Sequence, residues 1–125
     1  MDEHEQLASE PGRALPPQYH GETCVVSIFG EIDMASAPML REALDTAIVR
    51  GAHKLIADLS GVTFLDSTGL GVLLRCDQTL AETGGELIVV IRNHSIRRTI
   101  EVANLDLILH LETTLITALL QFATR

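Results

Sequence analysis

Short apolar runs of β type alternate along this chain with segments of helical periodicity from residue 24 onward. Strands are expected at 24–29, 54–59, 86–91 and 107–111, and helices are expected to begin near residues 36, 67, 95 and 114. Alternation of this kind favours a mostly parallel sheet whose strands are joined by helical crossovers. The run 86–91 is almost continuously apolar, which is typical of a strand covered on both faces. The sequence therefore predicts a single small α/β domain with a mostly parallel β-sheet and alternating helices.

The length and charge of the chain exclude several kinds of protein. A chain of 125 residues suffices for one domain with a core, and its net charge of −8 disfavours direct binding to nucleic acid, which requires a basic surface. No apolar run approaches the ~18–20 residues of a membrane-spanning helix, and the N-terminus lacks a secretory signal pattern. Two cysteines, Cys24 and Cys76, in such a chain indicate a reducing compartment. We therefore expect a soluble, cytoplasmic protein, while its oligomeric state stays open.

The N-terminal segment differs in composition from the rest of the chain. Residues 1–17 are polar and are interrupted by three prolines and a glycine, so we expect a flexible tail there. The folded domain is expected to span 18–125. A short edge strand near 18–20 and a turn at Gly21 and Glu22 would lead into the first long strand.

A loop is expected at 61–65, between the second strand and a helix that begins abruptly at a polar pair. Asp66 and Ser67 are both good N-cap residues. A cap at Asp66 places Leu65 and Leu70 as an apolar staple, whereas a cap at Ser67 would pair an aspartate with a glycine. Asp66 is therefore the predicted cap. Ser67 then occupies the first helical position, at the carboxyl edge of the sheet, and its hydroxyl is free to react.

Gly69 and Gly71 fall inside the first two turns of this helix. Each glycine costs about 0.5–1 kcal/mol relative to alanine in a helix. One explanation is close packing of the helix on its own sheet or on a neighbouring helix. The other is close approach of a second molecule to the helix backbone. The sequence leaves both explanations open.

The sequence contains few signs of catalysis. The five histidines are scattered and none is paired with a cysteine or carboxylate at ligand spacing, so we expect no metal site and no cofactor. The two glycines after Ser67 are not followed by a Lys-Ser/Thr pair, so a phosphate-binding loop is absent. A serine hydrolase needs a small residue two positions before its nucleophile, and that position before Ser67 is Leu65. Neither His94 nor His110 is marked as a base by a neighbouring acid, so catalysis through Ser67 is disfavoured.

Several separated segments resemble one known family. Residues 64–71, Phe-Leu-Asp-Ser-Thr-Gly-Leu-Gly, resemble the Asp-Ser-(Ser/Thr)-Gly-Leu-Gly signature of bacterial anti-sigma factor antagonists, the STAS-domain family. Residues 30–33, Gly-Glu-Ile-Asp, are similar to the segment that precedes the first helix in that family. Residues 83–87 and 95–108 resemble its later turn, third helix and following strand. The resemblance covers about residues 24–122 in the right order and implies a STAS-like domain.

The family resemblance implies a protein without catalytic activity of its own that works by switching partners. Members bind an anti-sigma factor with a histidine-kinase-like ATP-binding fold, and this frees a sigma factor. The bound anti-sigma factor can phosphorylate the signature serine, which breaks the complex, and a metal-dependent Ser/Thr phosphatase restores it. By position the phosphoacceptor is Ser67. The residues implied to lie near the partner surface are Glu31, Asp33, Asp66, Thr68 and Gly69.

The chain departs from the family pattern in two places. Leu15, Pro16 and Pro17 stand where the family usually begins with a strand, which predicts a short or missing first strand. Thr68 replaces the serine often found second in the signature, but its extra methyl group stiffens the side chain, so we favour Ser67 as the acceptor. A phosphate on Ser67 would lie beside a helix N-terminus that favours anions, and we expect it to act at the interface without unfolding the domain.

Two other functions stay open as alternatives. Homologous STAS domains differ mainly in their partners, so a stressosome-like scaffold or a lipid-transport complex at the inner membrane is one alternative, although a chain of 125 residues with an intact Asp-Ser-Thr favours the anti-sigma factor antagonist. An enzyme that uses Ser67 as a nucleophile is the other alternative. The sequence identifies neither the anti-sigma factor, the sigma factor nor the upstream signal.

Overall fold

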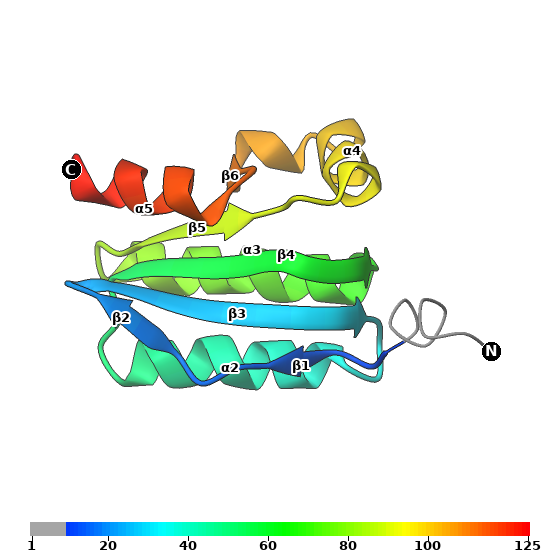
Figure 1. Cartoon of the computed structure of the whole chain (residues 1–125), viewed down its shortest axis with the longest axis horizontal. Coiled ribbons are helices and arrows are strands. Elements are labelled where there is room, and N and C mark those ends of the chain that lie inside the picture. The colour runs from blue at the N-terminus through cyan, green and yellow to red at the C-terminus, as the bar shows by residue number, and fades with distance from the viewer. Residues whose placement is uncertain (1–9) are drawn as a thin grey trace.

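A computed structural model describes residues 10–125, in which one mixed sheet forms the centre of the molecule (Figure 1). Its strands are β1 (Arg13–Ala14), β2 (Gln18–His20), β3 (Thr23–Ile32), β4 (Lys54–Leu65), β5 (Glu86–Val90) and β6 (His110–Glu112). The strand order is β1-β3-β4-β5-β6, and β2 also pairs with β3. The four strands from β3 to β6 are parallel, while β1 and β2 run antiparallel to β3. The predicted α/β domain with a mostly parallel sheet is therefore confirmed.

Helices cover the two faces of the sheet unequally. They are α2 (Ala37–Val49), α3 (Ser67–Glu82), α4 (His94–Val102) and α5 (Leu115–Ala123), with a short 3-10 helix, η1 (Leu105–Leu107). In the view of Figure 1, α2 and α3 lie behind the strands, and their buried leucines join the larger apolar cluster with residues of α4. The helix α5 packs on the opposite face through Ala118 and Phe122. The face with α2 and α3 therefore holds the larger of the two apolar clusters.

The strand β5 is buried on both faces of the sheet. Leu87 and Val89 point into the larger cluster, whereas Ile88 and Val90 point into the smaller cluster under α5. All four side chains are almost completely buried. Alternating side chains of one strand therefore enter two different cores, as its nearly continuous apolar sequence predicts.

Two segments differ from the sequence-based expectation. The expected loop at 61–65 is instead the end of β4, because Phe64 and Leu65 pair with the last residues of β3. The expected strand at 107–111 is divided between η1 and β6. Asn104 adopts a left-handed conformation after α4, with φ of 59°, and the chain then makes a 3-10 turn before it returns to the sheet. Both differences come from tertiary pairing, which short apolar runs do not specify.

The N-terminal segment is paired with the sheet further upstream than predicted. Arg13 and Ala14, expected within the flexible tail 1–17, form β1 opposite Phe29 and Ile28. The Glu31 N–H donates to the Glu10 carbonyl oxygen over 3.0 Å. Part of the expected tail therefore belongs to the sheet, whereas residues 1–9 lie outside the described part of the chain. The predicted edge strand at 18–20, with its turn into β3, is confirmed.

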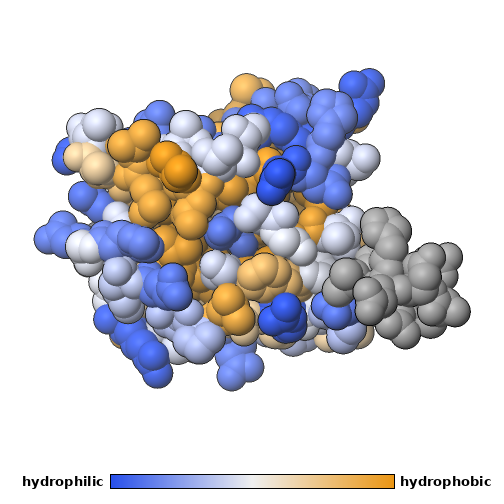
Figure 2. Space-filling model, viewed as in Figure 1, coloured by the Kyte–Doolittle hydropathy of each residue, from blue (hydrophilic) through white to orange (hydrophobic). Residues whose placement is uncertain are grey.

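One face of the molecule exposes apolar side chains. Figure 2 shows them gathered where α5 lies in Figure 1, and Ile116 and Leu120 are exposed large apolar residues of that helix. The same helix contributes Ala118 and Phe122 to the core, so it is apolar on more than one side. Within residues 10–125, no helix has the length and apolarity needed to cross a membrane.

The contact between the N-terminal segment and β3 predicts a difference between two glycine substitutions. Gly30 and Gly84 have similar positive φ angles, +85° and +79°, so alanine strains the backbone at both. A Cβ at Gly30 would lie 2.4 Å from the Pro11 carbonyl oxygen, whereas a Cβ at Gly84 meets no atom within 4 Å. We expect Gly30→Ala to lower the free energy of unfolding by about 2 kcal/mol more than Gly84→Ala, as measured by urea denaturation. Equal losses of unfolding free energy in the two variants would contradict this packing of the N-terminal segment against β3.

Candidate functional site

The candidate site lies at the carboxyl edge of the parallel strands. β3 and β4 end side by side, with Ile32 opposite Leu65, and α3 follows β4 directly (Figure 1). The Asp66 N–H donates to the Ile32 carbonyl oxygen over 3.1 Å, which joins the two strand ends. The segments around Glu31 and Ser67, separated in sequence, are therefore brought together as the resemblance implies.

Asp66 is the N-cap of α3, as predicted. Its Oδ1 accepts hydrogen bonds from the Thr68 N–H over 2.9 Å and from the Gly69 N–H over 3.2 Å, and it also accepts the Thr68 hydroxyl. The Thr68 hydroxyl is the main reason that the pKa of Asp66 lies below its ordinary value, and backbone N–H groups, including that of Met34, add to this effect. The cap therefore remains ionised at neutral pH and helps to fix the start of α3.

The two neighbouring hydroxyl groups differ in availability. Ser67 is exposed at the first position of α3, and within residues 10–125 its side chain makes no hydrogen bond. The Thr68 hydroxyl is bound to the Asp66 carboxylate. This difference favours Ser67 over Thr68 as the residue presented to an enzyme, for a reason that is independent of the family signature.

The two acidic residues at the end of β3 that are expected near the partner, Glu31 and Asp33, differ as well. Asp33 Oδ1 accepts hydrogen bonds from the N–H groups of Ala35 and Ser36 over 3.0 and 3.1 Å, so it organises the turn that leads into α2. The Glu31 carboxylate makes no ion pair within the described residues. Asp33 thus has a structural role at this edge, while the Glu31 side chain is available for an external contact.

The structure separates the two explanations left open for the glycines of α3. Gly69 is buried, and a Cβ there would lie 2.4 Å from Leu65 Cδ1 and 2.9 Å from Ile32 Cγ2. Gly71 has no atom within 4 Å of its hypothetical Cβ. Gly69 therefore serves packing inside the domain, and its place near the partner surface stays a prediction. Gly71 is the open position.

A groove of about 410 Å³ lies between α2 and α3 beside Ser67. Met34, Pro38 and Arg41 line it from the α2 side, and Ser67, Gly71 and Arg75 line it from α3. Sequence reasoning did not identify either arginine. Ser67, Gly71 and Arg75 are spaced by four residues along one face of a helix, which was an available signal for Arg75. Arg41 comes from another helix, so only the packing of α2 on α3 places it here.

The groove lacks the groups that other chemistries would require. Its lining residues include no histidine, aspartate or glutamate, so neither His94 nor His110 lies there as a base for Ser67. Within the described part of the chain, no group of three or more His, Cys, Asp or Glu side chains could hold a metal ion. The arrangement is suited to binding, with one free hydroxyl and two guanidinium groups at its surface.

The contrast between Gly69 and Gly71 predicts opposite effects of the same substitution in one helix. Gly71→Ala is expected to raise the free energy of unfolding by about 0.5–1 kcal/mol, because alanine favours the helix and meets no neighbour. Gly69→Ala is expected to lower it by about 1–3 kcal/mol, because the new methyl group overlaps Leu65 and Ile32. Thermal and urea denaturation measure the change in the free energy of unfolding for both variants. Stabilisation by Gly69→Ala would show that this helix is not packed as described.

Comparison with known protein families assigns most of the chain to one family. The family model of the STAS domain matches residues 15–118. The anti-sigma-F factor antagonist RsfB of Mycobacterium tuberculosis is 36% identical over 100 residues, which cover 80% of this chain and 81% of that protein. The residues that match the family model include the strand ends, the α3 start and the groove described above.

Solved structures give the same result. An anti-sigma factor antagonist from Mycobacterium paratuberculosis is 36% identical, with a TM-score of 0.82 over 90% of this chain and 97% of that chain. The Bacillus cell fate determinant SpoIIAA in its phosphorylated form is 25% identical, with a TM-score of 0.65 over 85% of this chain and 96% of that chain. Sequence and fold therefore agree, and this chain belongs to the STAS domain family.

Proposed function

We propose that this chain is an anti-sigma factor antagonist that binds an anti-sigma factor, releases a sigma factor and is switched off by phosphorylation of Ser67. Two relatives from Mycobacterium are named anti-sigma factor antagonists, and the match to this chain covers most of the length of each. The observation that carries the assignment of Ser67 is its exposed hydroxyl, which makes no hydrogen bond within residues 10–125, next to a threonine whose hydroxyl is bound. That difference leaves one acceptor at the surface of the signature segment.

The proposed kinase is the bound anti-sigma factor, with a histidine-kinase-like ATP-binding fold. In this reaction the Ser67 oxygen forms a bond to the γ-phosphorus of ATP while the bond to the β–γ bridging oxygen breaks. ADP leaves with that electron pair, and the hydroxyl proton passes to a base of the partner or to solvent. The relative SpoIIAA has been solved in a phosphorylated form, which supports phosphorylation as a state available to this fold.

The phosphorylated state is proposed to keep the fold and lose the partner. A phosphate carries about −1.5 to −2 charge at neutral pH and lies favourably beside a helix N-terminus, where backbone N–H groups point outward. It adds bulk and negative charge at the Ser67 edge of the groove. A Ser/Thr phosphatase with its own metal ions would then hydrolyse the ester, with water supplying the fourth oxygen of the released phosphate.

The chain itself is proposed to act by binding, without catalysis of its own, in the cytoplasm. A nucleophilic role for Ser67 would need a base, and no residue lining its groove is a histidine or a carboxylate. Cys24 and Cys76 are free and buried, which supports a compartment where thiols stay reduced. The Glu31 carboxylate, Asp66, Thr68 and the groove beside Ser67 form the proposed partner surface.

Affinity capture with three versions of the full chain tests this function. Wild type, Ser67→Glu and Ser95→Glu are used to retain proteins from the native host, which are identified by mass spectrometry. Ser95 is a matched control because it is also an exposed serine in the first turn of a helix, α4. We expect wild type and Ser95→Glu to retain an ATP-binding anti-sigma protein, and Ser67→Glu to lose it.

Other outcomes of the capture contradict parts of the proposal. Retention of the same anti-sigma protein by Ser67→Glu would make this chain a constitutive binder and remove Ser67 as the switch. Recovery of scaffold or membrane-transport proteins by wild type would assign the domain to another assembly. Circular dichroism of the phosphorylated chain provides an independent check, because global unfolding would show that the phosphate does not act at the interface.

A further inference from the structure

The groove beside Ser67 is positively charged, although the chain is acidic. The chain has 17 acidic residues and nine Lys and Arg residues, for a net charge of −8. Two of those nine, Arg41 and Arg75, line this groove, and its lining includes no acidic side chain. The lining of this groove therefore carries two positive charges in a chain whose net charge is negative.

Neither arginine is fully engaged within the domain. The Arg75 guanidinium makes no hydrogen bond or ion pair within residues 10–125. Arg41 Nε lies 3.5 Å from Asp45 Oδ2, and both side chains are 57% exposed. An exposed pair of this kind contributes little to stability and exchanges readily for another anion. Both cations are thus available to a ligand.

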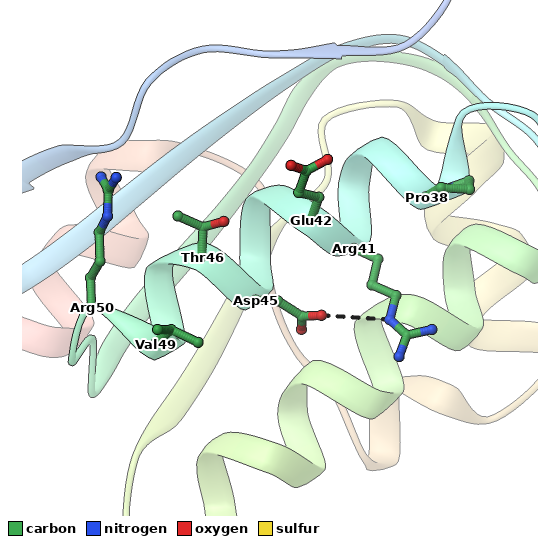
Figure 3. Close-up of a pocket in the computed structure, with 7 residues that line it drawn as sticks. All are labelled: Pro38, Arg41, Glu42, Asp45, Thr46, Val49 and Arg50. Carbon is green, nitrogen blue, oxygen red and sulfur yellow. Dashed lines mark ion pairs between the residues drawn. The ribbon is translucent and has the colours of Figure 1, made fainter.

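Figure 3 shows how Arg41 is directed. Its side chain leaves α2 toward the neighbouring helix α3, whereas Arg50, at the other end of α2, points to the opposite side. Arg41 belongs to both the hollow drawn in Figure 3 and the groove beside Ser67, while Arg50 belongs only to the first. Arg41, inside α2, and Arg50, the residue directly after α2, therefore provide a matched comparison, with equal charge and different positions.

The rest of the groove is suited to a polypeptide. Met34 is 76% exposed at its rim, and Pro38 and Val72 add apolar lining. The absence of a side chain at Gly71, with no atom within 4 Å of its hypothetical Cβ, exposes the backbone of α3 to close approach. Apolar walls, an open backbone position and two cations favour a segment that carries both apolar side chains and a carboxylate.

We propose that the α2–α3 groove holds a carboxylate-bearing segment of the anti-sigma partner through Arg41 and Arg75, and that a phosphate on Ser67 takes over these two arginines. The proposal rests on the proposed function and names the chemistry by which the same site recognises its partner. Charge complementarity selects the occupant, since a basic or neutral segment gains nothing from the two guanidinium groups.

This arrangement explains how one modification releases the partner without a change of fold. The phosphate brings about −1.5 to −2 charge, close in magnitude to the +2 of the two arginines. Ser67 lines the same groove, on the same face of α3 as Arg75. Once phosphorylated, the groove becomes nearly neutral, and the partner carboxylate loses its cations and meets a negative group.

Phosphorus NMR of the full chain with phosphoserine placed at position 67 tests the arginine contact without any partner. Adjacent guanidinium groups are expected to hold the second pKa of this phosphate below its ordinary value of about 6. In the double variant Arg41→Gln/Arg75→Gln we expect that pKa to rise by about half a pH unit or more. The control Arg50→Gln removes the same charge directly after the C-terminal end of α2 and should leave the titration unchanged. Equal titration in wild type and the double variant would overturn the capture of the phosphate.

Binding of the purified anti-sigma factor of the host, measured by calorimetry, tests the carboxylate contact. Arg41→Gln and Arg75→Gln are each expected to weaken binding by about tenfold or more, while Arg50→Gln changes it by less than about twofold. Gly71→Ala, which leaves the fold intact, is expected to weaken binding because its methyl group occupies the open position.

The two experiments separate failure of this inference from failure of the proposed function. If wild type binds the anti-sigma factor and the arginine variants bind equally well, the proposed function stands and the carboxylate contact is wrong. If wild type binds no anti-sigma factor, the proposed function fails and the partner contact falls with it. The phosphorus titration still decides whether Arg41 and Arg75 reach a phosphate on Ser67.

Discussion

The capping of α3 by the Asp66 carboxylate is the interaction on which the rest of the site depends. This side chain binds the N–H groups of Thr68 and Gly69, while the Asp66 backbone N–H binds the Ile32 carbonyl oxygen at the end of β3. One residue therefore joins a helix start to a neighbouring strand end. Because its pKa is lowered, its contribution to stability is present above the ordinary pKa of an aspartate and is lost only as the pH falls through the lowered value. The position of Ser67 is fixed without any contribution from its own hydroxyl.

Local chemistry made much of this arrangement predictable. The choice of Asp66 over Ser67 as cap followed from the staple between Leu65 and Leu70, and both of these leucines are buried in the structure. The left-handed Asn104 and the turn at Gly21 and Glu22 are equally local signals. Each depends on residues within five positions of one another, so a single sequence contains the information needed.

The features that escaped prediction depend on contacts between distant segments. Gly69 and Gly71 look alike in sequence, yet one packs against Ile32 of β3 and the other faces open space. The pairing of β1 with β3 involves two residues, too few to produce a hydrophobic pattern. Arg41 reaches the site only because α2 packs beside α3. Sequence reasoning therefore placed Ser67 correctly at the first position of α3 and left the cations around it unidentified.

Helical periodicity gives the start of α3 two separate tasks. Gly69 faces the core and Asp66 secures the helix end, whereas Ser67, Gly71 and Arg75 lie along the open face, one turn apart. A change on the open face leaves the packed face untouched. Such a change therefore alters the free energy of binding to a partner and hardly alters the free energy of unfolding. A modification that had to act through Thr68 would first break the hydrogen bond to Asp66 and loosen the cap itself. The separation of the two faces is thus the physical reason why a serine at the first position of this helix is suited to regulate binding while the domain stays folded.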